Sequence, residues 1–454
     1  MRWLLRCLAV LACVVLMPFL SRGSSDGCTV ERVDYLGWEA LRLSNGIITL
    51  HIVPSIGGRV MQLDLGGHSY FAIHPKWKGQ VVPPAESQFG MTWKNYGGDK
   101  IWPAPQGWQR DDQWPGPPDP VFDAGPYTAE IVTATPEEVA VRLSSGPDEY
   151  TGLQMGRTIR IYRGSSRISV ESFMKNISKR PVRWSIWEVT QLDTASAGDP
   201  RDYEKDFWAY CPINPDSMFP RGFNYMFGQV HHPSFSIDET GRLFRVHYRY
   251  LVGKVGLDSS AGWLAVVNRT RRFAFFESFE YVPEATYPDN ASVEFWLHGP
   301  GDFINNQEVI SMPPDPEVTP YLMESEILSP LVTLEPGEEY RFDLSWYVGR
   351  TGGPVVDVTP VGAVHEPLQV AGQGAEQTLM GKFAVFYEGQ VTATFYSAAG
   401  TELATVVLSN VNPLEEFVLN KKLELPTAAY RVSLRLKDKE NEIRGVLAEK
   451  VLIE

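Results

Sequence analysis

The chain has 454 residues, of which 43% are hydrophobic, and its formal net charge at pH 7 is −14. A chain of this length exceeds one ordinary hydrophobic core, so we expect two or three domains. The negative charge, with no basic stripe, argues against a nucleic-acid-binding protein, because neutralising phosphates requires clustered Lys and Arg side chains.

The N-terminus has the pattern of a secretory signal peptide, which we place at residues 1–23. Arg2 and Arg6 form a short basic region, and an apolar run from Cys7 to Leu20 follows it. This run is short for a membrane span. No A-x-A cleavage motif is visible, however, so the alternative is that the segment is not cleaved and anchors the protein in a membrane. We therefore expect an exported protein, periplasmic or extracellular, which contacts a membrane only if this segment is retained.

Two cysteines, Cys28 and Cys211, remain after the expected signal peptide is removed. In an exported protein such a pair can form one disulfide, although Cys28 can equally remain unpaired. No Cys-x-x-Cys or Cys/His spacing indicates a metal site, and the acidic residues of segment 111–119 lack the spacing of a calcium loop. The sequence predicts neither a metal nor a cofactor.

Strand patterns dominate the chain from residue 40 onward. Asn45-Gly46 separates two β-rich runs, which is a strong hairpin signal. No segment of ten or more residues has helical periodicity. Many short strands with frequent turn signals predict an all-β protein, with a large β-sandwich or barrel over residues 30–350. Further strand patterns cover residues 129–143, 155–174, 184–192, 243–252, 262–268, 272–281, 291–298, 321–334 and 340–347.

The C-terminal part of the chain has a different organisation. Residues 351–370 are rich in Gly, Pro and Val and are interpreted as a linker. Residues 371–454 contain some seven short strand patterns and no cysteine. Their length and pattern are typical of a small immunoglobulin-like β-sandwich.

The most unusual segment runs from Met91 to Tyr127, with four tryptophans and many prolines. Each proline fixes φ and removes a backbone donor, so we expect a long irregular loop, and such loops usually have a function. The flat faces of Trp93, Trp102 and Trp114, beside polar side chains, would suit a sugar ring. The alternative is a lid that only covers one end of a sheet.

Several motifs resemble those of one known family. They are Asn45-Gly46, PSIGGR at 54–59, WKNYGGDK at 93–100, WPAPQ at 102–106, FDAGPY at 122–127, TGLQ at 151–154 and WSIWEVTQ at 184–191. Through these motifs, residues 40–350 resemble a bacterial family known only as domain of unknown function 4380, which looks like a branch of the galactose-mutarotase-like superfamily. The resemblance implies a β-supersandwich and affinity for saccharides. No histidine of the chain stands in a motif of the aldose 1-epimerases, so no catalytic histidine carries over.

Under this interpretation, a saccharide or glycan lies on the concave face of the sheet under the Trp- and Pro-rich loop. The loop and the neighbouring strands supply aromatic faces together with hydrogen-bonding groups. The candidate ligand-binding residues are Arg59, Trp93, Asn95, Tyr96, Asp99, Lys100, Trp102, Gln106, Trp114, Gln154, Arg157, Gln191 and Lys254.

Three glutamates are candidates for acid–base chemistry. Strand alternation places Glu324 and Glu326 on one face, about 7 Å apart, where like charges can raise one pKa toward general acid–base function. The alternative is a solvated face or a salt-bridge partner. By alternation, Glu188 shares one face with Trp184, with Trp187 and Gln191 on the opposite face, and Arg157 also points inward. The two form either a structural ion pair or a sugar-binding pair.

Three functions remain open at the level of sequence. The first is an exported carbohydrate-binding protein. The second is a carbohydrate-active enzyme, either an aldose 1-epimerase-like isomerase or a glycan hydrolase or lyase, that uses Glu188, Glu324 or Glu326. The third is a cell-envelope scaffold whose loop binds another protein, since tryptophan is also common in protein interfaces.

Overall fold

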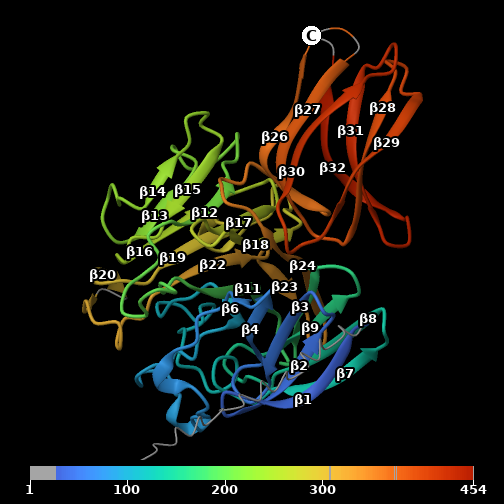
Figure 1. Cartoon of the computed structure of the whole chain (residues 1–454). Helices are drawn as coiled ribbons and strands as arrows, with labels where there is room; N and C mark the ends of the chain where they lie inside the picture. Colours follow the sequence, from blue (N-terminus) through green and yellow to red (C-terminus); the bar gives the residue numbers. More distant parts are fainter. Residues whose placement is uncertain (1–26, 306–307, 373, 375, 453–454) are drawn as a thin grey trace, which may run out of the picture.

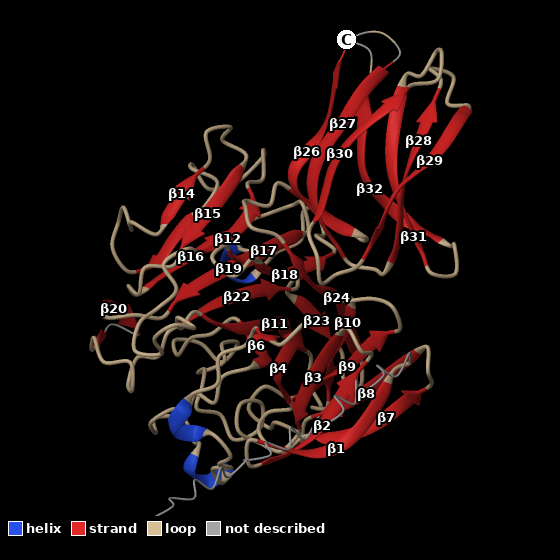
Figure 2. Ribbon diagram, viewed as in Figure 1, coloured by secondary structure: helices blue, strands red, loops and turns tan. Residues whose placement is uncertain are grey.

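The computed structural model describes residues 27–305, 308–372, 374 and 376–452, so the expected signal peptide lies outside the described residues. Within these ranges strands dominate, and the helices are three single 3₁₀ turns, η1 (Pro75–Trp77), η2 (Pro84–Glu86) and η3 (Pro288–Asn290). None of the described helices has the length and apolarity needed to cross a membrane. Figure 2 shows the predominance of strands, and the predicted all-β class is confirmed.

Two large antiparallel sheets form the body of the molecule (Figure 1). In the described part of the chain the first has 12 strands. Ten follow one another in the order β1 (Thr29–Tyr35), β2 (Trp38–Ser44), β3 (Ile48–Val53), β4 (Arg59–Leu65), β6 (Asp99–Ala104), β11 (Val182–Asp193), β22 (Leu322–Leu328), β19 (Val293–Leu297), β16 (Gly253–Leu257) and β13 (Asn224–Phe227). Beside this path, β5 (His68–Ser69) pairs with β4 and β23 (Val332–Leu334) pairs with β11.

The second sheet has ten strands among the described residues. Their order is β14 (Phe235–Ile237), β15 (Leu243–His247), β12 (Phe207–Pro212), β17 (Trp263–Asn268), β18 (Phe273–Phe279), β24 (Glu339–Arg350), β10 (Ile168–Asn176), β9 (Leu153–Tyr162), β8 (Glu138–Ser144) and β7 (Thr128–Ala134). A separate hairpin, β20 (Gly301–Asn305) with β21 (Glu308–Met312), follows β19. The expected Asn45-Gly46 turn joins β2 to β3, and Gly46 has a φ of 84°, which favours glycine.

The two sheets pack face to face, and the alternation of side chains along each strand decides what enters the core. We call the side that faces the other sheet the inner face and the opposite side the outer face. Leu50 and Val60 of the first sheet and Ile159, Val170 and Phe275 of the second belong to one buried apolar cluster. This cluster is the main hydrophobic core.

The outer face of the second sheet is covered by the C-terminal part of the chain. Phe276 and Tyr347 on that face pack against Ala384 and Phe386 in a buried cluster. The C-terminal part is built from two four-stranded sheets of described residues. One contains β25 (Asp357–Thr359), β26 (Gly362–Gly372), β27 (Glu376–Val385) and β30 (Phe417–Glu424); the other contains β29 (Glu402–Val411), β28 (Gly389–Tyr396), β31 (Arg431–Asp438) and β32 (Ile443–Val451).

The segment between β5 and β7 lies over the outer face of the first sheet, and we call this segment the cover. Tyr96 and Val82 from this segment pack with Trp38 and Met61 of the sheet. The cover comes very close at Gly57, whose backbone N–H donates to the Gly125 carbonyl at 2.8 Å. A side chain at Gly57 would collide with this cover, because its Cβ would lie 2.4 Å from the Asp123 carbonyl oxygen.

Three expectations from the sequence need correction. Residues 357–370, which were expected within a linker at 351–370, form β25 and most of β26, because apolar residues such as Val364 and Leu368 are buried in the C-terminal core. The proline-rich segment contains the regular strand β6, and Pro103 is tolerated there because β6 pairs with β4 only at Asp99. The possible Cys28–Cys211 disulfide is absent, since both thiols are free and buried within different parts of the core.

Candidate functional site

Five neighbouring strands of the first sheet place a row of polar side chains on its outer face. The register sets Gln191 of β11 opposite Glu324 of β22, and Glu326 of β22 opposite Glu294 of β19. On the two flanking strands, the same face carries Lys100 and Lys254. These six residues, Lys100, Gln191, Lys254, Glu294, Glu324 and Glu326, form what we call the outer row.

Lys254 bridges two carboxylates at one end of the outer row. Its Nζ atom lies 2.7 Å from Glu294 Oε2 and 2.9 Å from Glu326 Oε2. The Trp187 indole N–H also donates to Glu326 Oε2, at 2.8 Å. Burial alone would lower the pKa of Lys254, but the two carboxylates raise it instead, so this ammonium stays charged.

Lys100 and Glu324 form a looser pair further along the row. Lys100 Nζ lies 3.8 Å from Glu324 Oε1, and that oxygen accepts a hydrogen bond from the Gln191 amide. Burial lowers the pKa of Lys100 to about 8, with Glu324 opposing the shift. Burial also raises the pKa of Glu324, again with Lys100 opposing it. The two groups therefore lie closer to neutral pH than exposed Lys and Glu side chains do.

Several buried polar atoms on this face have no hydrogen-bond partner within the protein. Such atoms are costly unless something satisfies them, and in native structures they require an explanation. The atoms are Lys100 Nζ, Trp102 Nε1, Gln191 Oε1, Glu294 Oε1 and Glu326 Oε1. The outer row therefore has unused hydrogen-bonding capacity directed at whatever occupies this face.

A hollow of about 120 Å³ opens at the Lys254 end of the outer row, and we call it the Trp108 hollow. Its walls combine aromatic, amide and charged side chains, a combination suited to a small polar ligand. The lining residues are Ala104, Gln106, Trp108, Trp187, Met226, Phe227, Lys254, Asp289, Glu294 and Leu328.

A second hollow, of about 220 Å³, lies on the same outer face, on the other side of Glu324 from the Trp108 hollow. We call it the His74 hollow. Leu322 of β22 lines it, whereas Leu328 of the same strand lines the Trp108 hollow. The two hollows are therefore about 20 Å apart along β22, from six residues of strand rise. Asn95, His74, Asp193 and Tyr321 contribute its polar groups, and four prolines line much of the rest.

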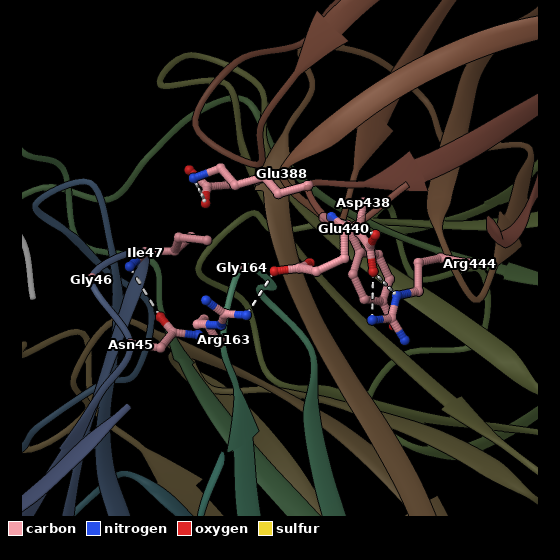
Figure 3. A pocket seen from close by; sticks show the side chains of 11 residues that line it. Asn45, Gly46, Ile47, Arg163, Gly164, Glu388, Asp438, Glu440 and Arg444 are labelled. Atoms are coloured by element: carbon pink, nitrogen blue, oxygen red, sulfur yellow. Dashed lines mark hydrogen bonds and ion pairs between the residues drawn. The ribbon is translucent and has the colours of Figure 1, made fainter. Parts of the chain in front are cut away.

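A third hollow, of about 200 Å³, lies where the C-terminal part meets the large sheets (Figure 3). Its charged side chains pair with one another, as Arg163 does with Glu440 at 2.6 Å and Arg444 with Asp438 at 2.5 Å. The Asn45 amide is also satisfied, because it donates to the carbonyl oxygens of Tyr162 and Ser165. This junction hollow has the features of a contact between two parts of the chain rather than those of a ligand site.

The inner face of the same strands carries a different polar cluster. Arg157 of β9 reaches across to Asp99 and lies 2.9 Å from Glu188 Oε1. Glu277 accepts hydrogen bonds from Thr190 at 3.4 Å and Ser325 at 2.6 Å. All six residues are fully buried between the sheets. We call Asp99, Arg157, Glu188, Thr190, Glu277 and Ser325 the inner network.

Burial dominates the titration of the inner network. Together with a smaller effect of the nearby Asp99, it raises the pKa of Glu277 to about 8. Burial and Asp99 together raise the pKa of Glu188 well above its ordinary value, against the effect of Arg157. The inner network thus holds one guanidinium, which contacts Asp99 and Glu188, and three carboxyl groups, and at neutral pH at least one of these carboxyl groups holds a proton.

The structure places the residues proposed from sequence in several different parts of the molecule. Lys100, Gln191, Glu324, Glu326 and Lys254 come together in the outer row, where Lys254 also lines the Trp108 hollow. Gln106 lines that hollow as well, and Asn95 lines the His74 hollow. Asp99, Arg157 and Glu188 lie in the inner network, which makes the Arg157–Glu188 contact a structural ion pair. Gln154 is remote from all of these groups and donates to the Ser145 carbonyl on the second sheet.

The remaining predicted residues hold the cover in place. Trp102 is in contact with Trp93, Trp114 and Trp187, with ring centroids 5.3–6.0 Å apart, so the predicted platforms Trp93, Trp102 and Trp114 pack on one another through Trp102. Arg59 is fully buried and pairs with Asp123, which also accepts from Trp93. The Tyr96 hydroxyl accepts from the Val82 backbone N–H at 3.0 Å.

Of the ten residues that line the Trp108 hollow, sequence reasoning had named only Gln106 and Lys254, and it missed Trp108, Asp289 and Glu294 among the others. Trp108 is one of the four tryptophans in the loop, and the sequence alone does not reveal that it is half-exposed and lines a hollow. Glu294 could have been found, because it alternates with Val293, Phe295 and Leu297 along a strand and thus points away from the core. Asp289 lies in η3 between strands and carries no such signal.

No group of three or more His, Cys, Asp or Glu side chains among the described residues could hold a metal ion.

Comparison with known families gives one match by sequence. Residues 38–349, more than half of the chain, match the family described as domain of unknown function (DUF4380). No match to a curated protein was found by sequence.

Solved structures of similar fold share little sequence with this chain. A TPR-domain containing protein from Parabacteroides distasonis has a TM-score of 0.48 and 14% identity over 71% of this chain, which spans 49% of that protein. A galactose mutarotase-like protein from Lactobacillus casei has a TM-score of 0.43 and 11% identity, covering 68% of this chain and 99% of that one. Another such protein, from Clostridium acetobutylicum, has a TM-score of 0.43 and 10% identity, covering 72% and 99%. At this level of likeness, no residue role is transferred to this chain.

Proposed function

The chain belongs to the DUF4380 family, and we propose that it is an exported protein that binds a saccharide in the Trp108 hollow. The observation that carries this proposal is the composition of that hollow, in which Trp108, Trp187 and Phe227 stand beside Gln106, Lys254, Asp289 and Glu294. The export step rests on the N-terminal sequence alone.

The chemistry of a sugar ring fits this combination. A pyranose has an apolar face of C–H groups, which aromatic rings can cover, and an edge of hydroxyls that both donate and accept hydrogen bonds. The unpartnered Glu294 Oε1 can accept from a hydroxyl, and the Gln106 side-chain amide, which is exposed, offers a donor and an acceptor. Affinity for one sugar unit is expected to be modest, because the hydroxyls lose water on binding.

A glycan array followed by isothermal titration tests the proposal. We expect the wild-type chain to bind a defined subset of glycans and Trp108→Ala to weaken that binding by about tenfold or more, in line with the loss of a stacked aromatic ring. Trp208→Ala is the matched control, because Trp208 is also half-buried but lies on the second sheet. Equal binding by wild type and Trp108→Ala would contradict the proposed location.

A carbohydrate-active enzyme is the second candidate, and the Lys100–Glu324 pair favours it. Burial moves the pKa of Lys100 down to about 8 and that of Glu324 up, which is the direction needed for proton transfer near neutral pH. Glu324→Gln and Glu326→Gln would then abolish turnover of a bound glycan while ligand affinity changes little. If the wild-type chain turns over none of the glycans it binds, the enzyme hypothesis fails and the binding hypothesis stands.

A cell-envelope scaffold remains the alternative outcome of the same array. Silence toward every glycan, together with retained binding to an envelope protein, would favour it over both saccharide hypotheses.

A further inference from the structure

The charged side chains around the Trp108 hollow are not balanced. Lys254 is the cation among the described residues that line it, whereas Asp289 and Glu294 line it as acids. Lys254 is already shared, because its Nζ atom contacts both Glu294 and Glu326. One ammonium therefore faces three carboxyl groups at this end of the outer row.

Glu294 is the group that leaves bonding capacity unused. Its residue is 1% exposed, and while Oε2 binds Lys254, Oε1 has no partner within the protein. A buried carboxylate oxygen is best satisfied by a charged donor. An ammonium group, with three N–H donors, matches that need better than a hydroxyl, which has one.

The aromatic walls favour the same chemistry. A cation over the face of an indole ring is attracted by the ring quadrupole, and tryptophan is the best partner for it. The hollow already shows this contact, since Lys254 Nζ lies 4.7 Å from the centre of the Trp187 ring. Trp108 and Phe227 provide further aromatic surface in the same hollow.

We propose that the Trp108 hollow selects saccharides that carry a free amino group, that is, deacetylated amino sugars, over neutral and acidic ones. This inference rests on the saccharide function proposed above and adds the chemical class of the ligand. The amino group would donate to Glu294, with Asp289 close enough to share its charge, while the ring lies against aromatic surface.

A proton balance gives the proposal a second readout. Burial raises the pKa of Glu294 to about 8, with Glu326 of β22 and Asp289 of η3 adding to this shift and Lys254 of β16 opposing it. In the protein without a ligand, the Glu294 carboxyl group is therefore protonated at about pH 6. When an ammonium binds there, the carboxyl group ionises, because the positive charge favours its ionised form. Binding of an amino sugar then releases the Glu294 proton to the buffer, whereas binding of a neutral sugar does not.

Three oligosaccharides of equal length separate the possibilities by isothermal titration of the full chain. Chitosan, cellulose and chitin hexasaccharides share one linkage and differ at C2, which carries an ammonium, a hydroxyl or an acetamide. At about pH 6 we expect the chitosan hexamer to bind about tenfold more tightly than the other two, the size of one hydrogen bond to a charged group. We also expect its heat, measured in buffers of different ionisation enthalpy, to report release of about one proton.

Variants assign the effect to the hollow. Glu294→Gln keeps the shape of the side chain and removes its charge, so the ratio of chitosan to cellulose affinity should fall toward one and the proton release should disappear. Should that variant fold poorly, Asp289→Asn is the second test, because Asp289 is exposed and Asn tolerates its φ of 52°. Glu171→Gln, an acid on the second sheet that pairs with Arg160, is the matched control and should change neither quantity.

The outcomes are distinct. Equal affinity for the three hexamers would overturn the amino-sugar proposal and leave the saccharide function standing. Binding of spermidine as tight as that of the chitosan hexamer would overturn it as well, because an ammonium without a sugar ring would then suffice. Silence toward all three hexamers and toward a glycan array would remove the proposed function itself.

Discussion

The two faces of strands β6, β11 and β22 carry polar groups in adjacent sequence positions, yet they differ in kind. Asp99 and Lys100 are neighbours in the chain, but the first belongs to the inner network and the second to the outer row. The inner network is closed by the second sheet, and Arg157 crosses the core to meet its acids. The outer row is bordered by hollows instead.

This difference separates charges that hold the fold from charges that can meet a ligand. In the inner network, protein groups partner both oxygens of Asp99 and both oxygens of Glu277, and of its six residues only Glu188 keeps a polar atom, Oε2, without a partner. In the outer row, Lys100, Gln191, Glu294 and Glu326 each keep a buried polar atom without a partner. Buried charge alone therefore does not identify a site, whereas unsatisfied charge next to a hollow does.

The largest expected effect comes from breaking the inner network at its cation. Arg157→Leu leaves Asp99 and Glu188 buried without their guanidinium, and such a loss typically costs about 3–5 kcal/mol of unfolding free energy. Denaturant unfolding followed by circular dichroism measures it. A loss below about 1 kcal/mol would show that the inner network does not hold the two sheets together.

A pH dependence of intermediate size is expected from Glu277. Its pKa in the folded state is raised to about 8, so its stabilising contribution is complete below its unfolded pKa, about 4.5, and is lost as pH rises toward 8. Relative to Glu277→Gln, which cannot ionise, the wild-type chain should lose about 1.4 kcal/mol of unfolding free energy per pH unit in this window. Parallel curves for the two proteins between about pH 5 and 8 would contradict a protonated Glu277.

The smallest effect is expected from the outer row. Lys100→Met removes a fully buried ammonium that makes no hydrogen bond, and Glu324 keeps its bond from Gln191. We expect the unfolding free energy to change by less than about 1 kcal/mol, because the lost attraction is offset by the lost desolvation penalty. A cost as large as that of Arg157→Leu would mean that the two faces do not differ as described.

Much of the fold follows from the sequence, because strand alternation is a local signal. The pattern around Glu324 and Glu326 correctly placed both on one face, and the pattern around Glu188 separated it from Trp187 and Gln191. The strand β6 was hidden by its prolines, since a local rule cannot know that β6 lacks a full partner on one side. The strands in residues 357–372 were hidden in the same way by glycine and proline content.

The candidate site was harder to predict, because alternation gives the face but not what lies on it. Asp99 and Lys100 looked equivalent as ligand contacts, and only the pairing of β6 with β11 assigns them to opposite faces. Trp93, Trp102 and Trp114 looked like sugar platforms, and only the tertiary packing shows that they contact one another through Trp102. Alternation could have placed Glu294 on the outer face, but no sequence spacing reveals that Asp289 of η3 lines the same hollow as Glu294 of β19.

The most direct test of the central claim is a crystal structure of the full chain with a bound oligosaccharide. A sugar ring in the Trp108 hollow, with a polar atom within hydrogen-bond distance of Glu294, is the predicted result. A sugar bound in the His74 hollow or the junction hollow, with none in the Trp108 hollow, would contradict it.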